Sequence, residues 1–271
     1  MKKVLSVILA VILMACVCVP SFAASKRLNY VLLGDSIAFG SGIANPGEAC
    51  YGRIVANTNG YNYWNFGVDG ATTSALLKRI GETDVANAIK KADIISISTG
   101  GNNFLLGNMF WIFVNTIFGG TRAIDDIVDG VYADLGKIIP AIKKLNPKAT
   151  ILLQTLYNPW KMAGISAIYQ KATGALNECF RKYLRENPGA YEIVEVAAAF
   201  AASDEDLIAF DTIHPNAEGN KVIAKVILKK LKALGLGTKT EPVILAEPID
   251  KVSLNPDDYY RMGLYYINLF L

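Results

Sequence analysis

The sequence has few of the residues on which metal, redox or nucleic-acid chemistry depends. Of its 271 residues one is histidine and four are cysteine, and it contains no Cys-x-x-Cys motif. A metal site would have few ligands to draw on, so we expect neither a metal nor any other cofactor. The formal net charge is only +3, without a cluster of Lys and Arg for phosphate contacts. Nucleic acid is therefore not an expected partner.

The first 23 residues have the composition of an export signal. Lys2 and Lys3 precede an apolar run over Val4–Val19, and Ser21-Phe22-Ala23 supplies small residues for cleavage. We expect cleavage after Ala23 and a secreted protein. The alternative is a retained membrane anchor, although a run of about 16 residues is short of the ~20 that a spanning helix needs.

Cysteine usage adds a third outcome for this segment. Leu13-Met14-Ala15-Cys16 resembles the box at which bacterial lipoproteins are cut and acylated, so a lipoprotein anchored through Cys16 is the other alternative. Loss of the signal would leave Cys50 and Cys179. Outside the cytosol these two either pair or remain separate thiols.

Hydrophobic patterning predicts an α/β protein. Five short runs rich in β-branched or aromatic residues read as buried strands: Asn29–Leu33, Tyr61–Phe66, Asp93–Thr99, Ala149–Thr155 and Tyr191–Val196. Segments of helical period lie over Thr73–Lys91, Ile124–Leu145, Ile165–Glu186 and Pro215–Leu234. Because strands and helices alternate, we expect a five-stranded parallel sheet with helices on both faces.

The chain divides into a signal at residues 1–23, one domain at 24–235 and an extension at 236–271. The extension mixes Gly, Pro, Thr and charged residues before Tyr259–Leu271, which is dense in aromatic side chains. We expect it to fold back on the domain. The alternative is contact with a membrane surface or a partner. The sequence leaves the oligomeric state open.

Motifs suited to chemistry follow the first three predicted strands, at the edge where parallel sheets bind ligands. Gly34-Asp35-Ser36 presents a hydroxyl, and its alternative role is a helix cap. Asn65–Gly70 is a glycine-bearing turn that would let a backbone N–H approach a substrate oxygen. Gly100-Gly101-Asn102 places an amide that would either donate to an oxyanion or cap the next helix.

The strongest single signal surrounds the only histidine, in Asp211-Thr212-Ile213-His214-Pro215. A carboxylate three residues before a histidine can turn back to accept from the ring Nδ1–H, which leaves Nε2 to act as a base. A serine nucleophile at neutral pH needs such a base. These residues predict a triad of Ser36, Asp211 and His214.

The four motifs, in this order, resemble the GDSL or SGNH hydrolases over residues 29–232. The resemblance implies a flavodoxin-like three-layer α/β/α domain and an oxyanion hole made by the Ser36 N–H, the Gly70 N–H and the Asn102 side chain. Two positions depart from the family pattern. Ile37 replaces Leu, and Asn103 stands where many members have Asp, which puts the geometry of that loop in doubt.

The expected activity is that of an exported serine esterase or lipase, lysophospholipases included, acting on a small-molecule or lipid ester. A carbohydrate O-acetyl esterase is the main alternative, and a catalytically silent exported binding module is another. Phe104–Phe118 is strongly apolar and is expected to be a buried core helix. Alternatively, Met109, Phe110, Trp111 and Phe113 bind substrate by lining an acyl-chain pocket or a lid.

Overall fold

The computed structural model describes residues 27–105, 109–160 and 163–251. Its centre is a five-stranded, wholly parallel sheet in the order β2-β1-β3-β4-β5. The strands are β1 (Asn29–Gly34), β2 (Asn62–Gly67), β3 (Ile94–Ser98), β4 (Thr150–Gln154) and β5 (Glu192–Val194). Each overlaps one predicted strand, and the order is that of a flavodoxin-like sheet.

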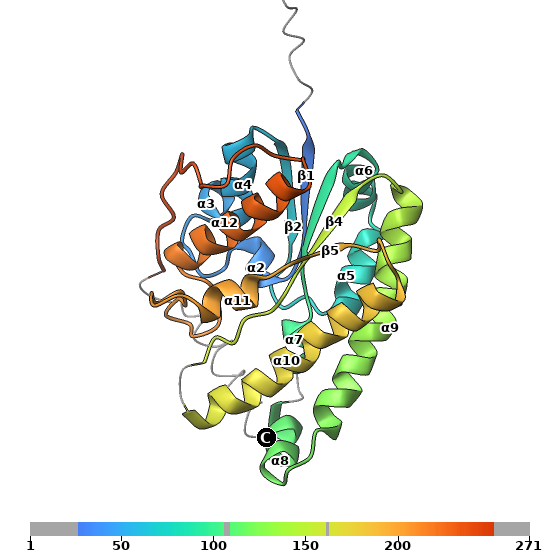
Figure 1. The fold of residues 1–271 in the computed structure, drawn as a ribbon, viewed down its shortest axis with the longest axis vertical. Helices are drawn as coiled ribbons and strands as arrows, with labels where there is room; N and C mark the ends of the chain where they lie inside the picture. Colours follow the sequence, from blue (N-terminus) through green and yellow to red (C-terminus); the bar gives the residue numbers. More distant parts are fainter. Residues whose placement is uncertain (1–26, 106–108, 161–162, 252–271) are drawn as a thin grey trace, which may run out of the picture.

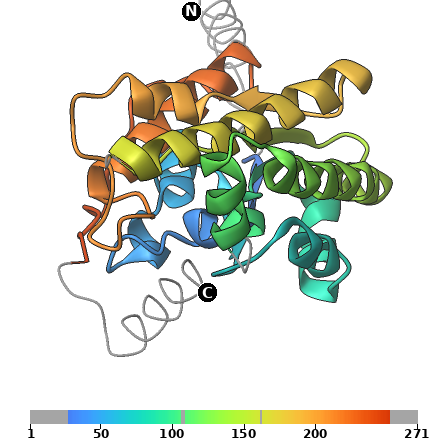
Figure 2. The ribbon, with the colours of Figure 1, turned by 90° about the horizontal axis from the view of Figure 1, so that it is seen from below.

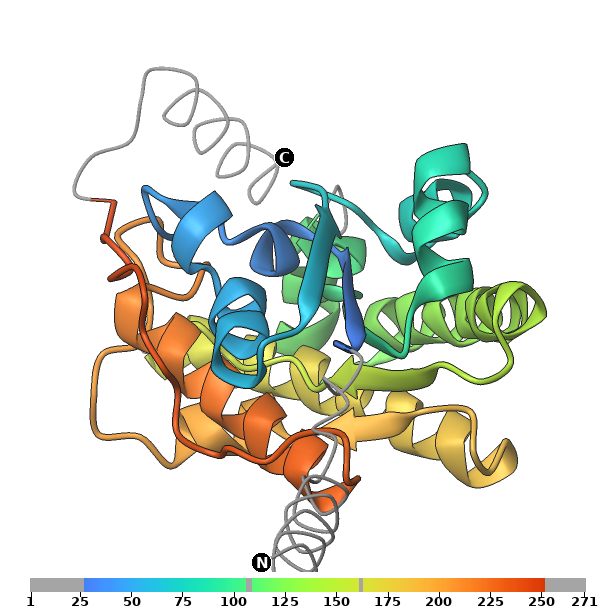
Figure 3. The same ribbon diagram turned by 90° about the horizontal axis from the view of Figure 1, so that it is seen from above.

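Helices cover both faces of the sheet, which makes three layers (Figure 1, Figure 3). On one face lie α5 (Thr73–Ile80), α6 (Thr83–Lys91), α9 (Arg122–Leu145) and α10 (Ala163–Glu186). On the other lie α2 (Ser36–Phe39), α4 (Tyr51–Asn59), α11 (Val196–Ala201) and α12 (Ala217–Ala233). The remaining helices of the described residues are α3 (Pro46–Ala49), α7 (Gly101–Leu105) and α8 (Met109–Ile117). None of the helices that the structure describes is both long and apolar enough to cross a membrane.

Alternation along the strands builds two cores. In β1, Val31 and Leu33 pack under α5 and α9, whereas Tyr30 and Leu32 pack under α4 and α12. Successive side chains of a strand point to opposite faces, so a strand covered on both sides is apolar throughout. The three-layer fold expected from the sequence is confirmed.

Three helix boundaries differ from the expected ones. The predicted helix over residues 73–91 is two helices, because the chain turns at Gly81 and Glu82 before α6 begins. The apolar segment 104–118 is likewise divided between α7 and α8. Pro215 precedes the last helix rather than starting it, since Asn216 is the N-cap and accepts from the Gly219 N–H at 2.8 Å.

Residues 236–251 lie against the domain. Leu236 and Ile244 pack on the core beneath α12, and Asp250 accepts from the Ala217 N–H at 2.6 Å, at the start of α12. The Ala44 N–H donates to the Ile249 carbonyl at 2.7 Å. Residues 1–23, with Cys16, and residues 252–271 lie outside the described part of the chain, so cleavage, lipidation and the role of the aromatic end stay predictions.

The two cysteines left open by the sequence are separate thiols. Cys50 is buried with Ile43 and Ala49, and Cys179 is buried in the core between α9 and α10.

The junction of β1 and β3 leaves no room for a side chain at Gly34. Its φ is +134°, and a Cβ there would lie 1.9 Å from the Ser98 carbonyl oxygen. We expect Gly34→Ala to lower the free energy of unfolding by about 3 kcal/mol or more, because the substitution combines backbone strain with overpacking. Urea denaturation would measure this loss. Gly47→Ala is the matched control, since nothing lies within 4 Å of its Cβ position, and a loss no larger than that of the control would contradict the expectation.

Candidate active site

The site lies at the carboxyl edge of the sheet, beside the point where the strand order reverses. In the sheet β2 lies on one side of β1 and β3 lies on the other, so the chain connections diverge at this point. Such a switch point forms a crevice in which ligands bind. In Figure 1 the strands finish above α7, α8 and the beginning of α10, and Figure 2 looks onto this end of the molecule. Ser36 is the first residue of α2 and is separated from the end of β1 only by the N-cap, Asp35.

The structure brings the three predicted triad residues together. Ser36 Oγ lies 2.7 Å from His214 Nε2, and Asp211 Oδ2 lies 2.6 Å from His214 Nδ1. The other carboxylate oxygen, Asp211 Oδ1, accepts from the backbone N–H groups of Ile213 at 3.0 Å and His214 at 2.9 Å. One carboxylate therefore fixes both the turn and the orientation of the imidazole ring.

Electrostatics keeps this carboxylate ionised. Burial acts to raise the pKa of Asp211, but the hydrogen bonds and the charge of His214 outweigh it, and the net pKa lies below the usual value. An ionised Asp211 can stabilise a positive charge on the His214 ring.

Two further features shape the loop between Asp211 and His214. Thr212 has a φ of +65°, a left-handed conformation that is uncommon for a residue with a Cβ. The Tyr157 hydroxyl, from the loop after β4, donates to the Ile213 carbonyl at 2.8 Å. Burial raises the pKa of Tyr157 well above its usual value, so the hydroxyl keeps its proton and remains a donor. Tyr157 is not among the site residues predicted from the sequence, although it lies three residues after the end of β4, where ligand-binding loops begin.

Asn102 lies at the same edge, on α7. Its Nδ2 donates one hydrogen bond to the Ala71 carbonyl at 3.0 Å, and the residue lines the cavity beside Ser36. An amide NH₂ has two hydrogens, so one donor is left for a ligand. Gly70 lies in the exposed turn before α5 with a φ of +73°. The Asn102–Ala71 hydrogen bond ties this turn to α7.

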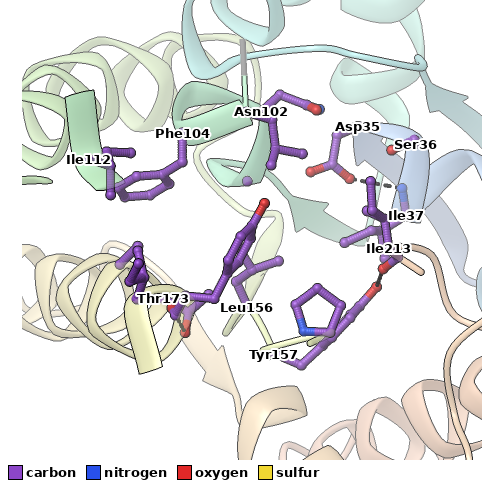
Figure 4. Close-up of a pocket in the computed structure, with 16 residues that line it drawn as sticks. Asp35, Ser36, Ile37, Asn102, Phe104, Ile112, Leu156, Tyr157, Thr173 and Ile213 are labelled. Carbon is purple, nitrogen blue, oxygen red and sulfur yellow. Dashed lines mark hydrogen bonds between the residues drawn. The ribbon is translucent and has the colours of Figure 1, made fainter. Parts of the chain in front are cut away.

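A cavity opens from Ser36 between α7, α8 and α10. In Figure 4 the polar groups Asp35, Ser36 and Asn102 lie at one end, and Phe104 and Ile112 lie at the other. Most other lining residues are apolar: Leu105, Leu156, Pro159, Ile168, Tyr169, Ala172 and Ile213. One reactive end and an apolar body suit a ligand with a hydrocarbon chain.

The apolar segment contributes to this cavity through residues other than those expected. Ile112 of α8 is buried and lines it, whereas Trp111 and Phe113 are not among the lining residues and are 59% and 40% exposed. Neighbours along a helix differ by about 100°, so only one of the three can face the same wall. The side chains of Met109 and Phe110 lie outside the described part of the structure.

Asp35 is a site residue that the sequence did not single out beyond its capping role. Its Oδ1 accepts from the Ile37 N–H at 3.0 Å and from the Ser98 hydroxyl at 2.9 Å, which joins the nucleophile turn to the end of β3. Burial raises the pKa of Asp35 to about 6, although both hydrogen bonds oppose the rise. Within the described ranges, no three His, Cys, Asp or Glu side chains gather as metal ligands.

Comparison with known proteins assigns the family. A model of the GDSL-like lipase/acylhydrolase family matches residues 32–222. The chain belongs to this family. Membership in the GDSL-like lipase/acylhydrolase family makes the protein a hydrolase of carboxylic esters, and it leaves the silent binding module without support.

Relatives of this GDSL-like chain include lipases. The spore germination lipase LipC of Bacillus licheniformis is 23% identical over 217 residues, which cover 78% of this chain and 97% of LipC. Among solved structures, the lipase Lip_vut3 from a goat rumen metagenome has a TM-score of 0.63 at 21% identity, covering 78% of this chain and 99% of that one. Phospholipase A1 from Streptomyces albidoflavus has a TM-score of 0.58 at 19% identity, over 74% and 98%. At 21% and 19% identity, the similarity to these two solved structures shows a shared fold only.

Asp35 should make stability depend on pH. Its pKa is about 6 in the folded protein, against an ordinary value of 3.8 for an aspartate side chain. As pH rises through this window the unfolded chain loses its proton first, so folded-state stability is lost with rising pH. We expect Asp35→Asn, which keeps an acceptor oxygen, to gain up to about 3 kcal/mol over the wild type between pH 4 and pH 7.5. Urea unfolding at both pH values measures this, and an equal difference at the two would contradict it.

Proposed function

We propose that this chain hydrolyses acyl esters by two-step transfer through Ser36, with His214 as general base and Asp211 as its orienting carboxylate. The observation that carries the proposal is the 2.7 Å contact between Ser36 Oγ and His214 Nε2 at the open end of the apolar cavity. A hydroxyl in this contact can lose its proton as it attacks. No cofactor takes part in these steps.

In the first step Ser36 Oγ attacks the ester carbonyl carbon and its proton passes to His214 Nε2. The tetrahedral intermediate collapses, the imidazolium protonates the departing alcohol, and an acyl-Ser36 ester remains. In the second step His214 takes a proton from water, the hydroxide attacks the acyl-enzyme, and Ser36 leaves with the proton returned by His214. The products are a carboxylic acid and an alcohol.

The negative charge on the carbonyl oxygen needs donors already in place. Asn102 is suited to this role because its side chain borders the cavity beside Ser36. One NH₂ hydrogen bonds to the Ala71 carbonyl and orients the amide, which leaves the other hydrogen for the substrate oxygen. We assign the other donors to the N–H groups of Ser36 and Gly70. The Asn102–Ala71 hydrogen bond supports this assignment, since it holds the Gly70 turn against α7. Donors fixed before the reaction do not have to reorganise during it.

The cavity favours an ester with a hydrocarbon acyl chain over a carbohydrate acetate. An acetyl group would contact only the lining residues nearest Ser36, whereas a longer chain would also bury against Phe104, Ile112 and Ala172. A lipid ester such as a lysophospholipid has this form. Secretion, drawn from residues 1–23, completes the proposal of an exported esterase or lipase.

Loss of either triad partner should abolish turnover without unfolding the protein. We expect Ser36→Ala and His214→Ala each to lower kcat on a p-nitrophenyl ester by ~10⁴-fold or more, since the triad acts as a unit. Circular dichroism would confirm that each variant is folded. Labelling by a fluorophosphonate probe should disappear in Ser36→Ala. Normal turnover by purified Ser36→Ala would refute the proposed nucleophile.

The acyl-chain preference can be tested by filling the cavity. If four more methylenes of an octanoyl chain are buried at ~0.8 kcal/mol each, kcat/KM for p-nitrophenyl octanoate should exceed that for the acetate by roughly 200-fold. Ala172→Leu should reduce this ratio, because Ala172 is buried on the cavity wall, whereas Ala167→Leu on the exposed side of α10 should not. Both esters are assayed below the micelle limit. A wild-type ratio near one, or a preference for acetate, would favour the carbohydrate deacetylase.

A further inference from the structure

Asn103, Thr73 and Asp134 form a chain of side-chain hydrogen bonds next to the two segments that carry the proposed oxyanion donors Asn102 and Gly70. The Asn103 side chain brackets Thr73, the first residue of α5: Asn103 Oδ1 accepts from the Thr73 N–H at 3.1 Å, and Asn103 Nδ2 donates to Thr73 Oγ1 at 2.9 Å. Thr73 Oγ1 in turn donates to Asp134 Oδ2 of α9 at 2.6 Å. Thr73 is fully buried.

The direction of this chain is fixed by chemistry. A backbone N–H can only donate, so the amide oxygen of Asn103 must face it, and the NH₂ must then face Thr73 Oγ1. The single hydroxyl hydrogen of Thr73 is used on Asp134. The donors therefore run from the amide to the hydroxyl to the carboxylate.

The chain joins the segments that carry the proposed oxyanion donors. Asn103 directly follows Asn102, and Thr73 ends the turn that contains Gly70. Asp134 ties both to α9, a long helix that packs on the sheet. A shift of either segment would move one donor relative to Ser36, and catalysis is sensitive to displacements of about 1 Å.

We infer that Asn103, Thr73 and Asp134 form a positioning relay that aligns the Asn102 and Gly70 donors, and that Asn is required at position 103 because Asp stands at position 134. This inference rests on the proposed ester hydrolysis. An Asp at position 103 would still accept from the Thr73 N–H. Its second oxygen would face the Thr73 hydroxyl oxygen, whose only hydrogen points to Asp134, so two acceptors would meet without a donor.

The complementarity can be reversed by exchanging the two side chains. In Asn103→Asp/Asp134→Asn the new carboxylate can accept from the Thr73 hydroxyl, and the new amide can donate to Thr73 Oγ1. The two side-chain hydrogen bonds to Thr73 Oγ1 then run in the opposite direction, each with a donor and an acceptor. Asp134→Asn alone should be mild, because an amide oxygen can still accept from Thr73.

The test is a double-mutant cycle on p-nitrophenyl octanoate. We expect Asn103→Asp to lower kcat by about 10- to 100-fold with little change in KM, since the cavity walls are untouched. Asp134→Asn should stay within about threefold of the wild type, and the double variant should return to that range. The matched control adds Asp129→Asn, an exposed acid of α9, to Asn103→Asp; it removes the same charge and should give no rescue.

Thermal unfolding supplies a readout that does not depend on turnover. Asn103→Asp should lower Tm, and the double variant should recover it. A change in kcat below threefold for Asn103→Asp, or no recovery in the double variant, would overturn the relay. If the wild type hydrolyses neither p-nitrophenyl acetate nor p-nitrophenyl octanoate, the proposed function fails. The relay is then decided by whether the double variant recovers the Tm that Asn103→Asp has lost.

Discussion

The pairing of β1 between β2 and β3 is the constraint on which the site depends. In a parallel sheet all carboxyl ends meet at one edge, so the loops after three strands converge there whatever their separation in sequence. At the junction of β1 and β3 the backbones approach so closely that only glycine fits at position 34. Asp35 reinforces the junction through the Ser98 hydroxyl, and Ser36 leaves the sheet in a fixed direction.

The site combines a rigid polar end with an apolar interior. Hydrogen bonds from separate segments hold the polar end in place. Asp211 accepts from the His214 N–H, and the Tyr157 hydroxyl donates to the Ile213 carbonyl of the same loop. The Asn102 side chain donates to the Ala71 carbonyl in the turn before α5. The apolar interior is built from helices α7, α8 and α10, which lie beyond the sheet. The proposed reacting groups and the proposed acyl-chain site thus lie in different parts of the fold. Under the proposed function, substitutions in the cavity wall would change which acyl chain is accepted while the reacting groups remain in place.

Much of the fold and of the candidate site could be predicted from the sequence because the signals are local. Alternating apolar strands, such as Val31 and Leu33 against Tyr30 and Leu32, follow from the two-residue period of a strand. The Asp211–His214 contact is also local, since three residues of turn bring the carboxylate to the ring. Helix ends were harder to place, because Asn216 rather than Pro215 caps the last helix, and both residue types favour a helix start.

The sequence by itself determined the layer architecture and the order of the motifs that follow the strands, and it identified the candidate residues for acyl transfer, since each depends on periodicity or on side chains a few residues apart. Only the tertiary structure decided which apolar side chains face the cavity, because Ile112 and its neighbour Trp111 differ only by rotation about a helix whose orientation is set by packing. It also decided that Thr73 meets Asn103 and Asp134, which lie 30 and 61 residues away along the chain. Contacts across such separations depend on how helices dock on the sheet, and no local pattern encodes that geometry.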